Sequence, residues 1–170
     1  SRAVEYSLTT LSEMQNKAVL DLISMLDVEP EDKVVKAVLV GNTDDSRAYD
    51  FYVQARGYLL NYQKLVNIDY AIQLFRRALK EDSSYALAYA GLGEAYWRKY
   101  DATKDKQWVE QAIRNAEKAT RLNDRLVPVY LTLGMIQKGT GNYQQAVLAL
   151  QRAVEIDSLN SDAYRGLADA

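Results

Sequence analysis

The side chains that most often carry chemistry in enzymes are scarce in this sequence. It contains no cysteine and no histidine, which removes thiolate nucleophiles, disulfides, imidazole bases and nearly all zinc, copper and iron sites. Its 23 acidic residues leave carboxylate chemistry open, and Glu94 and Asp101 are the residues that could carry it in a cleft. Acids scattered over helical surfaces are usually solvated, however. We therefore expect no enzymatic activity, no catalytic residue, no metal and no cofactor.

Other classes of partner are excluded by charge and hydropathy. The net charge is −2 and no run of basic residues exceeds two. The sequence therefore lacks the clustered positive charge that binds nucleic-acid phosphates. Gly91 and Gly93 lie inside a helical pattern and form no phosphate-binding loop. The chain has neither a signal-peptide pattern nor an apolar run of membrane-spanning length. We expect no membrane insertion and a cytoplasmic location, with the periplasm as the alternative.

A repeated pattern organises the chain from residue 46 onward. Tyr164 follows Tyr130 at the same interval at which Leu167 follows Leu133. Two earlier stretches have the same order of apolar, small and apolar residues at helical spacing, which predicts pairs of antiparallel amphipathic helices. Small residues are expected where paired helices approach most closely. They are Gly57, Gly93 and Gly134 in the first helices, and Ala71, Ala112 and Ala146 in the second.

The segment YLTLGMIQKGTGNYQQAVLALQRAVEIDSLN resembles a tetratricopeptide repeat, which has an aromatic residue, Leu-Gly, small residues and Ala at fixed offsets. The interval from Tyr130 to Tyr164 equals the length of that repeat. The resemblance covers about residues 46–170. It departs from the family at the end of each unit, where Ser83, Asp124 and Ser158 replace the usual proline.

The resemblance implies an all-α fold, a right-handed α-solenoid of antiparallel helix hairpins. The units would lie at about 50–85, 86–126 and 127–160, with a partial unit at 161–170.

The predicted units differ in length, and the second, from Tyr89 to Tyr130, is the longest. It exceeds the third by about seven residues, nearly two helical turns, so its first helix can lengthen while keeping its face. We expect this helix to end at residues 101–103. It would raise Tyr100 and Trp108 as a ridge at one rim of the groove.

Residues 1–45 form a separate N-terminal segment with a linker. Apolar residues at 8, 11, 18, 19, 22, 23 and 26 predict an amphipathic helix. Pro30 begins a second predicted helix, although its valines would also suit a strand. This order of elements, over about residues 5–125, resembles the junction in bacterial multidomain signalling proteins, where a Ser/Thr kinase, nucleotide cyclase or winged-helix module precedes tetratricopeptide repeats. It implies a fragment of such a protein.

The tetratricopeptide resemblance also implies a function and a site. It predicts a protein–protein interaction module whose first helices line a concave groove that docks a peptide or sister domain; self-association as a homo-oligomer is the alternative. One family device grips a C-terminal carboxylate with Lys, Asn and Arg, but its first-unit positions hold Gln54 and Tyr58 here. The clamp is therefore absent. The implied peptide-binding positions are Gln54, Tyr58, Asn61, Tyr62, Glu94, Trp97, Arg98, Leu131, Met135, Lys138 and Arg165.

Packing inside the array competes with peptide contact as the role of the large side chains. For Tyr58, Trp97 and Arg98 both roles stay open. A tyrosine has a large apolar ring with a polar tip, which suits half-buried seams between helices. Such a role is favoured for Tyr49, Tyr52, Tyr89, Tyr96 and Tyr130.

Overall fold

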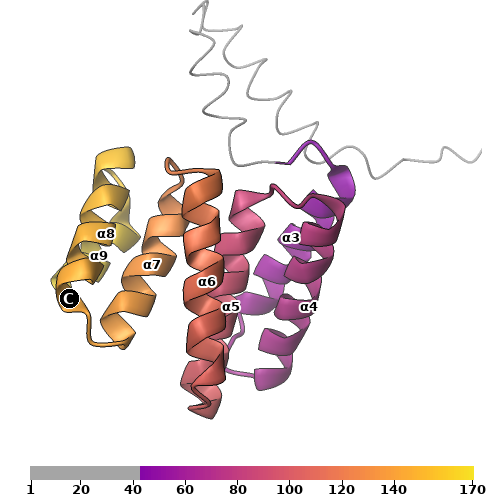
Figure 1. Cartoon of the computed structure of the whole chain (residues 1–170), viewed down its shortest axis with the longest axis horizontal. Helices are drawn as coiled ribbons and strands as arrows, with labels where there is room; N and C mark the ends of the chain where they lie inside the picture. Colours follow the sequence, from indigo (N-terminus) through magenta and orange to yellow (C-terminus); the bar gives the residue numbers. More distant parts are fainter. Residues whose placement is uncertain (1–42) are drawn as a thin grey trace, which may run out of the picture.

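The computed structural model describes residues 43–170, which contain only helices and no strand (Figure 1). The two helices predicted before residue 42 lie outside this range. The seven described helices are α3 (Ser46–Leu59), α4 (Leu65–Glu81), α5 (Ala86–Thr103), α6 (Gln107–Leu122), α7 (Val127–Gly139), α8 (Tyr143–Ile156) and α9 (Ser161–Ala168).

Consecutive helices pair as hairpins, and the hairpins stack in a row. α3 packs on α4, α5 on α6 and α7 on α8, while α5 also contacts α4 and α7, and α9 contacts both α7 and α8. Figure 1 shows this order along the long axis of the array. Because each hairpin buries its apolar side against its neighbours, the core runs continuously along the stack. The predicted all-α solenoid of helix hairpins is confirmed for this part of the chain.

The turns between hairpins are built on an Asp or Asn side chain rather than on proline. The Asp82 carboxylate accepts a hydrogen bond from the Ser84 backbone N–H at 2.8 Å. Asn123 and Asp157 accept in the same way from the N–H two residues further on, at 2.9 and 3.0 Å. A side chain that bonds the backbone two residues on stabilises a tight turn. These residues therefore stop each second helix where the family's proline is missing.

Close helix packing is confirmed at two of the three predicted glycines. A Cβ on Gly93 would lie 3.1 Å from the Ala112 carbonyl oxygen, and one on Gly134 would lie 2.7 Å from Leu150 Cγ. Gly57 does not fit this role, because nothing lies within 4 Å of the corresponding position. The predicted alanines all pack in the core with no exposed surface: Ala71, Ala112 and Ala146.

The exposed position of Gly57 follows from a different length of the first unit. Fully buried residues mark equivalent positions in successive units, and their spacing makes the first unit nearly as long as the second. They are Ala48, Ala88, Val129 and Ala163. The alignment of Gly57 with Gly93 therefore made the first unit too short by about four residues, or one helical turn, which preserved the amphipathic pattern. The extra residues lie between Ala48 and Ala71, in the turn after α3 and in the first turn of α4.

Helix α5 is the longest helix described and ends at Thr103, within the predicted range. Lys104 then takes a left-handed conformation with φ 58° and turns the chain into α6. The ridge predicted beyond this point is absent. Trp108 stacks on the Tyr96 ring at 5.7 Å between centroids, and Tyr100 packs against Trp97 at 5.1 Å. Both rings cover the core instead of rising above the array.

The five tyrosines expected between helices are partly or fully buried. Tyr49 and Tyr96 are buried, and the rings of Tyr52, Tyr89 and Tyr130 are half-buried. Each therefore occupies a seam between helices, as its amphipathic side chain favours.

Candidate functional site

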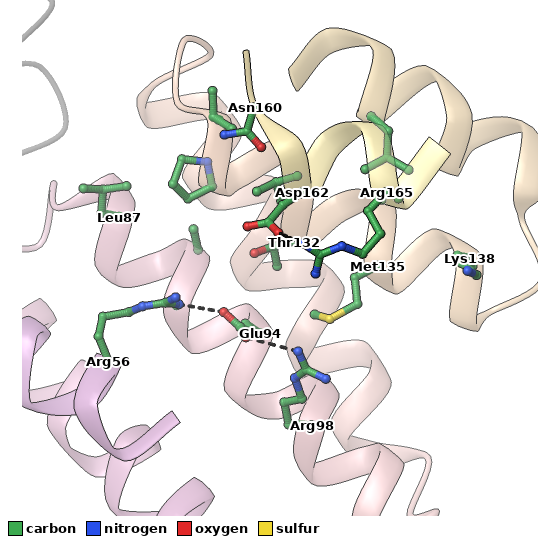
Figure 2. Close-up of a pocket in the computed structure, with 18 of the residues that line it drawn as sticks. Arg56, Leu87, Glu94, Arg98, Thr132, Met135, Lys138, Asn160, Asp162 and Arg165 are labelled. Atoms are coloured by element: carbon green, nitrogen blue, oxygen red, sulfur yellow. Dashed lines mark hydrogen bonds and ion pairs between the residues drawn. The ribbon is translucent and has the colours of Figure 1, made fainter. Parts of the chain in front are cut away.

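A groove of about 630 Å³ lies on the face formed mainly by the first helices of the hairpins, α3, α5, α7 and α9 (Figure 2). Ala90 and Gly91 of α5 leave room for the groove because their side chains are small or absent. Larger apolar side chains on α5 and α7 complete the lining. Leu150 reaches the groove from α8. The apolar lining residues are Leu87, Ala90, Val127, Pro128, Leu131, Met135 and Leu150. We call this cavity the groove below.

Three charged side chains in the lining of the groove form a linked group between α3 and α5. The Arg56 guanidinium donates to the Glu94 carboxylate at 2.7 Å, and Arg98, one turn further along α5, pairs with the other oxygen of Glu94 at 3.5 Å. Burial favours the neutral form of Arg56, but the adjacent carboxylate outweighs it and raises the pKa of Arg56. One carboxylate thus faces two guanidinium groups, so the trio carries a surplus of one positive charge.

Arg98 is held by an aromatic ring as well as by this ion pair. Its guanidinium carbon lies 4.0 Å from the centroid of the Tyr62 ring, which comes from the turn between α3 and α4. A cation over an aromatic face at this distance is attracted by the ring's quadrupole. The Nε of Arg98 is buried and has no hydrogen-bond partner among the described residues.

Two further ion pairs lie at the other side of the groove. Arg165 and Asp162 pair at 3.0 Å on α9, and Lys138 of α7 lies 3.9 Å from Asp169. All four side chains are exposed to solvent, so each pair adds little to stability. The charged groups of these pairs therefore remain available to a ligand.

Six of the eleven predicted site residues line the groove together. Tyr62 lies beside them through its contact with Arg98. Gln54, Asn61 and Tyr58 do not line it, and the Tyr58 ring packs on Tyr70 at 5.2 Å between centroids. The six residues that do line it are Glu94, Arg98, Leu131, Met135, Lys138 and Arg165.

Trp97 belongs to the core rather than to the groove. It is 8% exposed, and a Cβ on Gly139 would collide with its ring. The indole therefore fills the space between α5 and the end of α7, a space that exists because residue 139 has no side chain. Of the two roles that the sequence left open for Trp97, packing inside the array is the one observed.

Tyr52 and Arg56 line the groove from α3 and were missed by sequence reasoning. Correcting the four-residue offset in the first unit moves the inward positions to Asp50, Gln54, Gly57 and Tyr58, so it does not recover either residue. Burial raises the pKa of the Tyr52 phenol, which keeps it neutral at ordinary pH. Arg56 reaches the groove through its ion pair with Glu94 of α5 at 2.7 Å, and the repeat pattern carries no signal for this contact between helices.

The two acids considered for catalysis occupy different surroundings. Glu94 is engaged by two arginines, while Asp101 lies at the exposed end of α5 and pairs with Lys104 at 2.5 Å. Within residues 43–170 no cluster of three acidic side chains could hold a metal ion. In the same range no helix combines the length and apolarity needed to cross a membrane.

Comparison with known proteins agrees with this architecture. Residues 127–158, which comprise α7, α8 and the turn after them, match the family model of the tetratricopeptide repeat. A search of curated proteins finds no match to the sequence.

Solved structures show the same fold. A thermophilic tetratricopeptide-repeat protein from Thermus thermophilus is 26% identical, with a TM-score of 0.64 over 77% of this chain and 66% of its own. The tetratricopeptide-repeat domain of Arabidopsis OM64 is 16% identical, with a TM-score of 0.60 over 72% of this chain and 93% of its own. The first such domain of Spaghetti (RPAP3), solved with an HSP90 peptide, is 18% identical, with a TM-score of 0.60 over 75% and 92%. The described part of the chain therefore has the fold of tetratricopeptide-repeat domains.

Proposed function

We propose that this chain is a protein–protein interaction module that docks a peptide, or an extended segment of a sister domain, in the groove. The observation that carries the proposal is the groove itself. Its volume of about 630 Å³ lies within the range of roughly 300–1,000 Å³ for sites that bury most of a ligand's surface.

The lining of the groove suits a peptide better than a small charged metabolite. Leu131 and Met135 contribute apolar surface to the lining, and Arg56, Arg98 and Arg165 contribute charged groups. An apolar centre with a polar rim is the usual anatomy of a peptide or protein contact. A scaffold that positions side chains without a catalytic constellation is consistent with this role.

The RPAP3 domain supports the proposal by analogy, because its structure was solved with the HSP90 peptide SRMEEVD. The recognition chemistry differs, however. With the corrected length of the first unit, the clamp positions that fell on Gln54 and Tyr58 move to Asp50 and Gln54. Neither is a lysine or an asparagine, so we do not propose capture of a chaperone's C-terminal peptide by that clamp.

Peptide selection tests the proposal. Random peptides displayed on phage are selected against the whole chain, and binders are measured by fluorescence anisotropy. The double variant Leu131→Gln, Met135→Gln should weaken the selected peptides at least tenfold, since it removes the apolar centre. The matched control Leu148→Gln, Leu159→Gln alters two exposed leucines outside the groove and should leave binding unchanged. Binding that survives the groove variant would refute the proposal.

We also propose that the module serves within a larger bacterial signalling or regulatory protein, on the pattern of residues 5–125 described above. The genomic sequence around this segment tests the idea: a kinase, cyclase or winged-helix module should be encoded before Ser1. Self-association is tested separately by sedimentation over a concentration series, where a module that binds other proteins keeps a constant mass.

A further inference from the structure

The charges of the groove indicate which peptides it accepts, an inference that rests on the proposed function. We propose that the groove selects a peptide with a carboxylate group beside an apolar side chain. The carboxylate pairs with Arg98, and the apolar side chain packs on Met135 and Leu131. The carboxylate is that of an acidic side chain, because Asp50 and Gln54 occupy the positions that would grip the C-terminus of a peptide.

Arg98 is the incompletely paired cation of the groove. Glu94 is shared between two guanidinium groups, and Arg56 holds the short contact at 2.7 Å while Arg98 is left at 3.5 Å. A charge-assisted N–H···O bond normally measures about 2.7–2.9 Å. The Nε of Arg98 has no partner among the described residues either. Because that Nε is buried, an anionic group from a ligand would pair with the terminal nitrogens of the guanidinium, whose side chain is 27% exposed.

The surroundings of Arg98 determine what accompanies the anion. Figure 2 shows Met135 beside Arg98, with Arg165 above it on α9. Within residues 43–170, Arg165 pairs only with an exposed carboxylate of its own helix, so it can turn toward a ligand. A carboxylate between these two cations would place the neighbouring side chain of the peptide over Met135.

A basic peptide is the rival ligand, with Glu94 as its acceptor. Glu94 already faces two cations, and one of them binds it at 2.7 Å. A third cation would have to displace Arg56 or share a carboxylate that is already fully neutralised. The surplus of positive charge in this trio would also repel it. The charges therefore favour an acidic ligand.

The test uses peptides selected against the whole chain and confirmed to need the groove through the variant Leu131→Gln, Met135→Gln. Each is synthesised in its selected form, with Asp and Glu changed to the amides, and with its C-terminus free or amidated. Loss of the carboxylate should weaken binding about 10- to 100-fold, the effect of one charge-assisted contact. The loss should follow the change of Asp and Glu to the amides, whereas amidation of the C-terminus should leave binding unchanged.

Variants of the protein locate the contact. Arg98→Gln should weaken the acidic peptide by a similar factor and abolish the difference between the acidic and amide peptides, whereas Glu94→Gln should tighten the acidic peptide. The control Arg114→Gln changes an exposed arginine on α6 that is paired with Glu110 and should change nothing. Circular dichroism melts confirm that each variant is folded.

Two results would overturn this inference and leave the proposed function standing. Groove-dependent peptides could bind equally well without their side-chain carboxylates, or Glu94→Gln could weaken them, which would indicate a basic ligand. If no selected peptide depends on the groove, the proposed function itself fails.

Discussion

Replacing Tyr85 by phenylalanine should stabilise the protein, although it removes a polar group from the core. Tyr85 is 2% exposed, and its hydroxyl has no hydrogen-bond partner among the described residues. A buried polar group without a partner costs about 1–3 kcal/mol. The ring packs on Tyr52 at 5.2 Å between centroids, and phenylalanine keeps that contact. We therefore expect Tyr85→Phe to raise the free energy of unfolding by about 1 kcal/mol.

Tyr96→Phe is the matched control. Tyr96 is equally buried, but its hydroxyl accepts a hydrogen bond from Arg76 Nη2 at 2.6 Å. Removing this oxygen breaks a charge-assisted bond and should lower the free energy of unfolding by about 1 kcal/mol or more. Urea unfolding followed by circular dichroism at neutral pH measures both variants. The two changes should have opposite signs.

Alkaline pH provides a second measurement on Tyr85. Burial raises the pKa of its phenol above the ordinary value of 10.0. The unfolded chain therefore loses this proton more readily than the folded state, so the phenol's contribution to stability declines as the pH rises above 10.0. Tyr85→Phe lacks this decline, so its advantage over the natural protein should grow above that pH. The reasoning is refuted if Tyr85→Phe destabilises the protein at neutral pH by as much as Tyr96→Phe.

Three further predictions concern the backbone and the turns. Gly139→Ala should destabilise the protein by about 1–3 kcal/mol, because the added methyl group collides with Trp97. Gly57→Ala should stabilise it by about 0.5–1 kcal/mol, since residue 57 lies on a helix with open space around it. Equal effects of the two variants in thermal melts would contradict this prediction. Lys104→Gly should stabilise by about 1 kcal/mol, since Lys104 has φ 58°; a lower midpoint in urea would show otherwise. Burial favours the neutral form of Asp82, but hydrogen bonds from Ser84 and Thr43 outweigh it and lower its pKa from 3.8. The stability that these hydrogen bonds give to the ionised carboxylate is present above pH 3.8 and is lost as the pH falls through the lower pKa of Asp82 in the folded state. Asp82→Asn should therefore be less stable than the natural protein at neutral pH. The difference in stability should disappear in acid.

The helices and hairpin pairing could be predicted from the sequence because they depend on local periodicity. The end of α5 at Thr103 followed from the same argument, since an insertion of two turns returns a helix to its original face. Periodicity is also why the first unit was misaligned. A shift of one helical turn in α3 leaves the apolar stripe almost unchanged, so the pattern cannot distinguish Gly57 from the true counterpart of Gly93. The groove residues Tyr52 and Arg56 are missed in either alignment, because neither stands at an inward position of the repeat.

Trp97 shows the other kind of information that a repeat pattern lacks. Its position in α5 matches an inward site of the family, and its size suits a ligand contact. Its burial depends on Gly139 at the end of α7, in the next unit of the array, where the absent side chain leaves room for the indole. The repeat pattern identifies which residues of a helix face inward. Whether the side chain of such a residue stays exposed to a partner depends on the side chains of the next hairpin that pack against it.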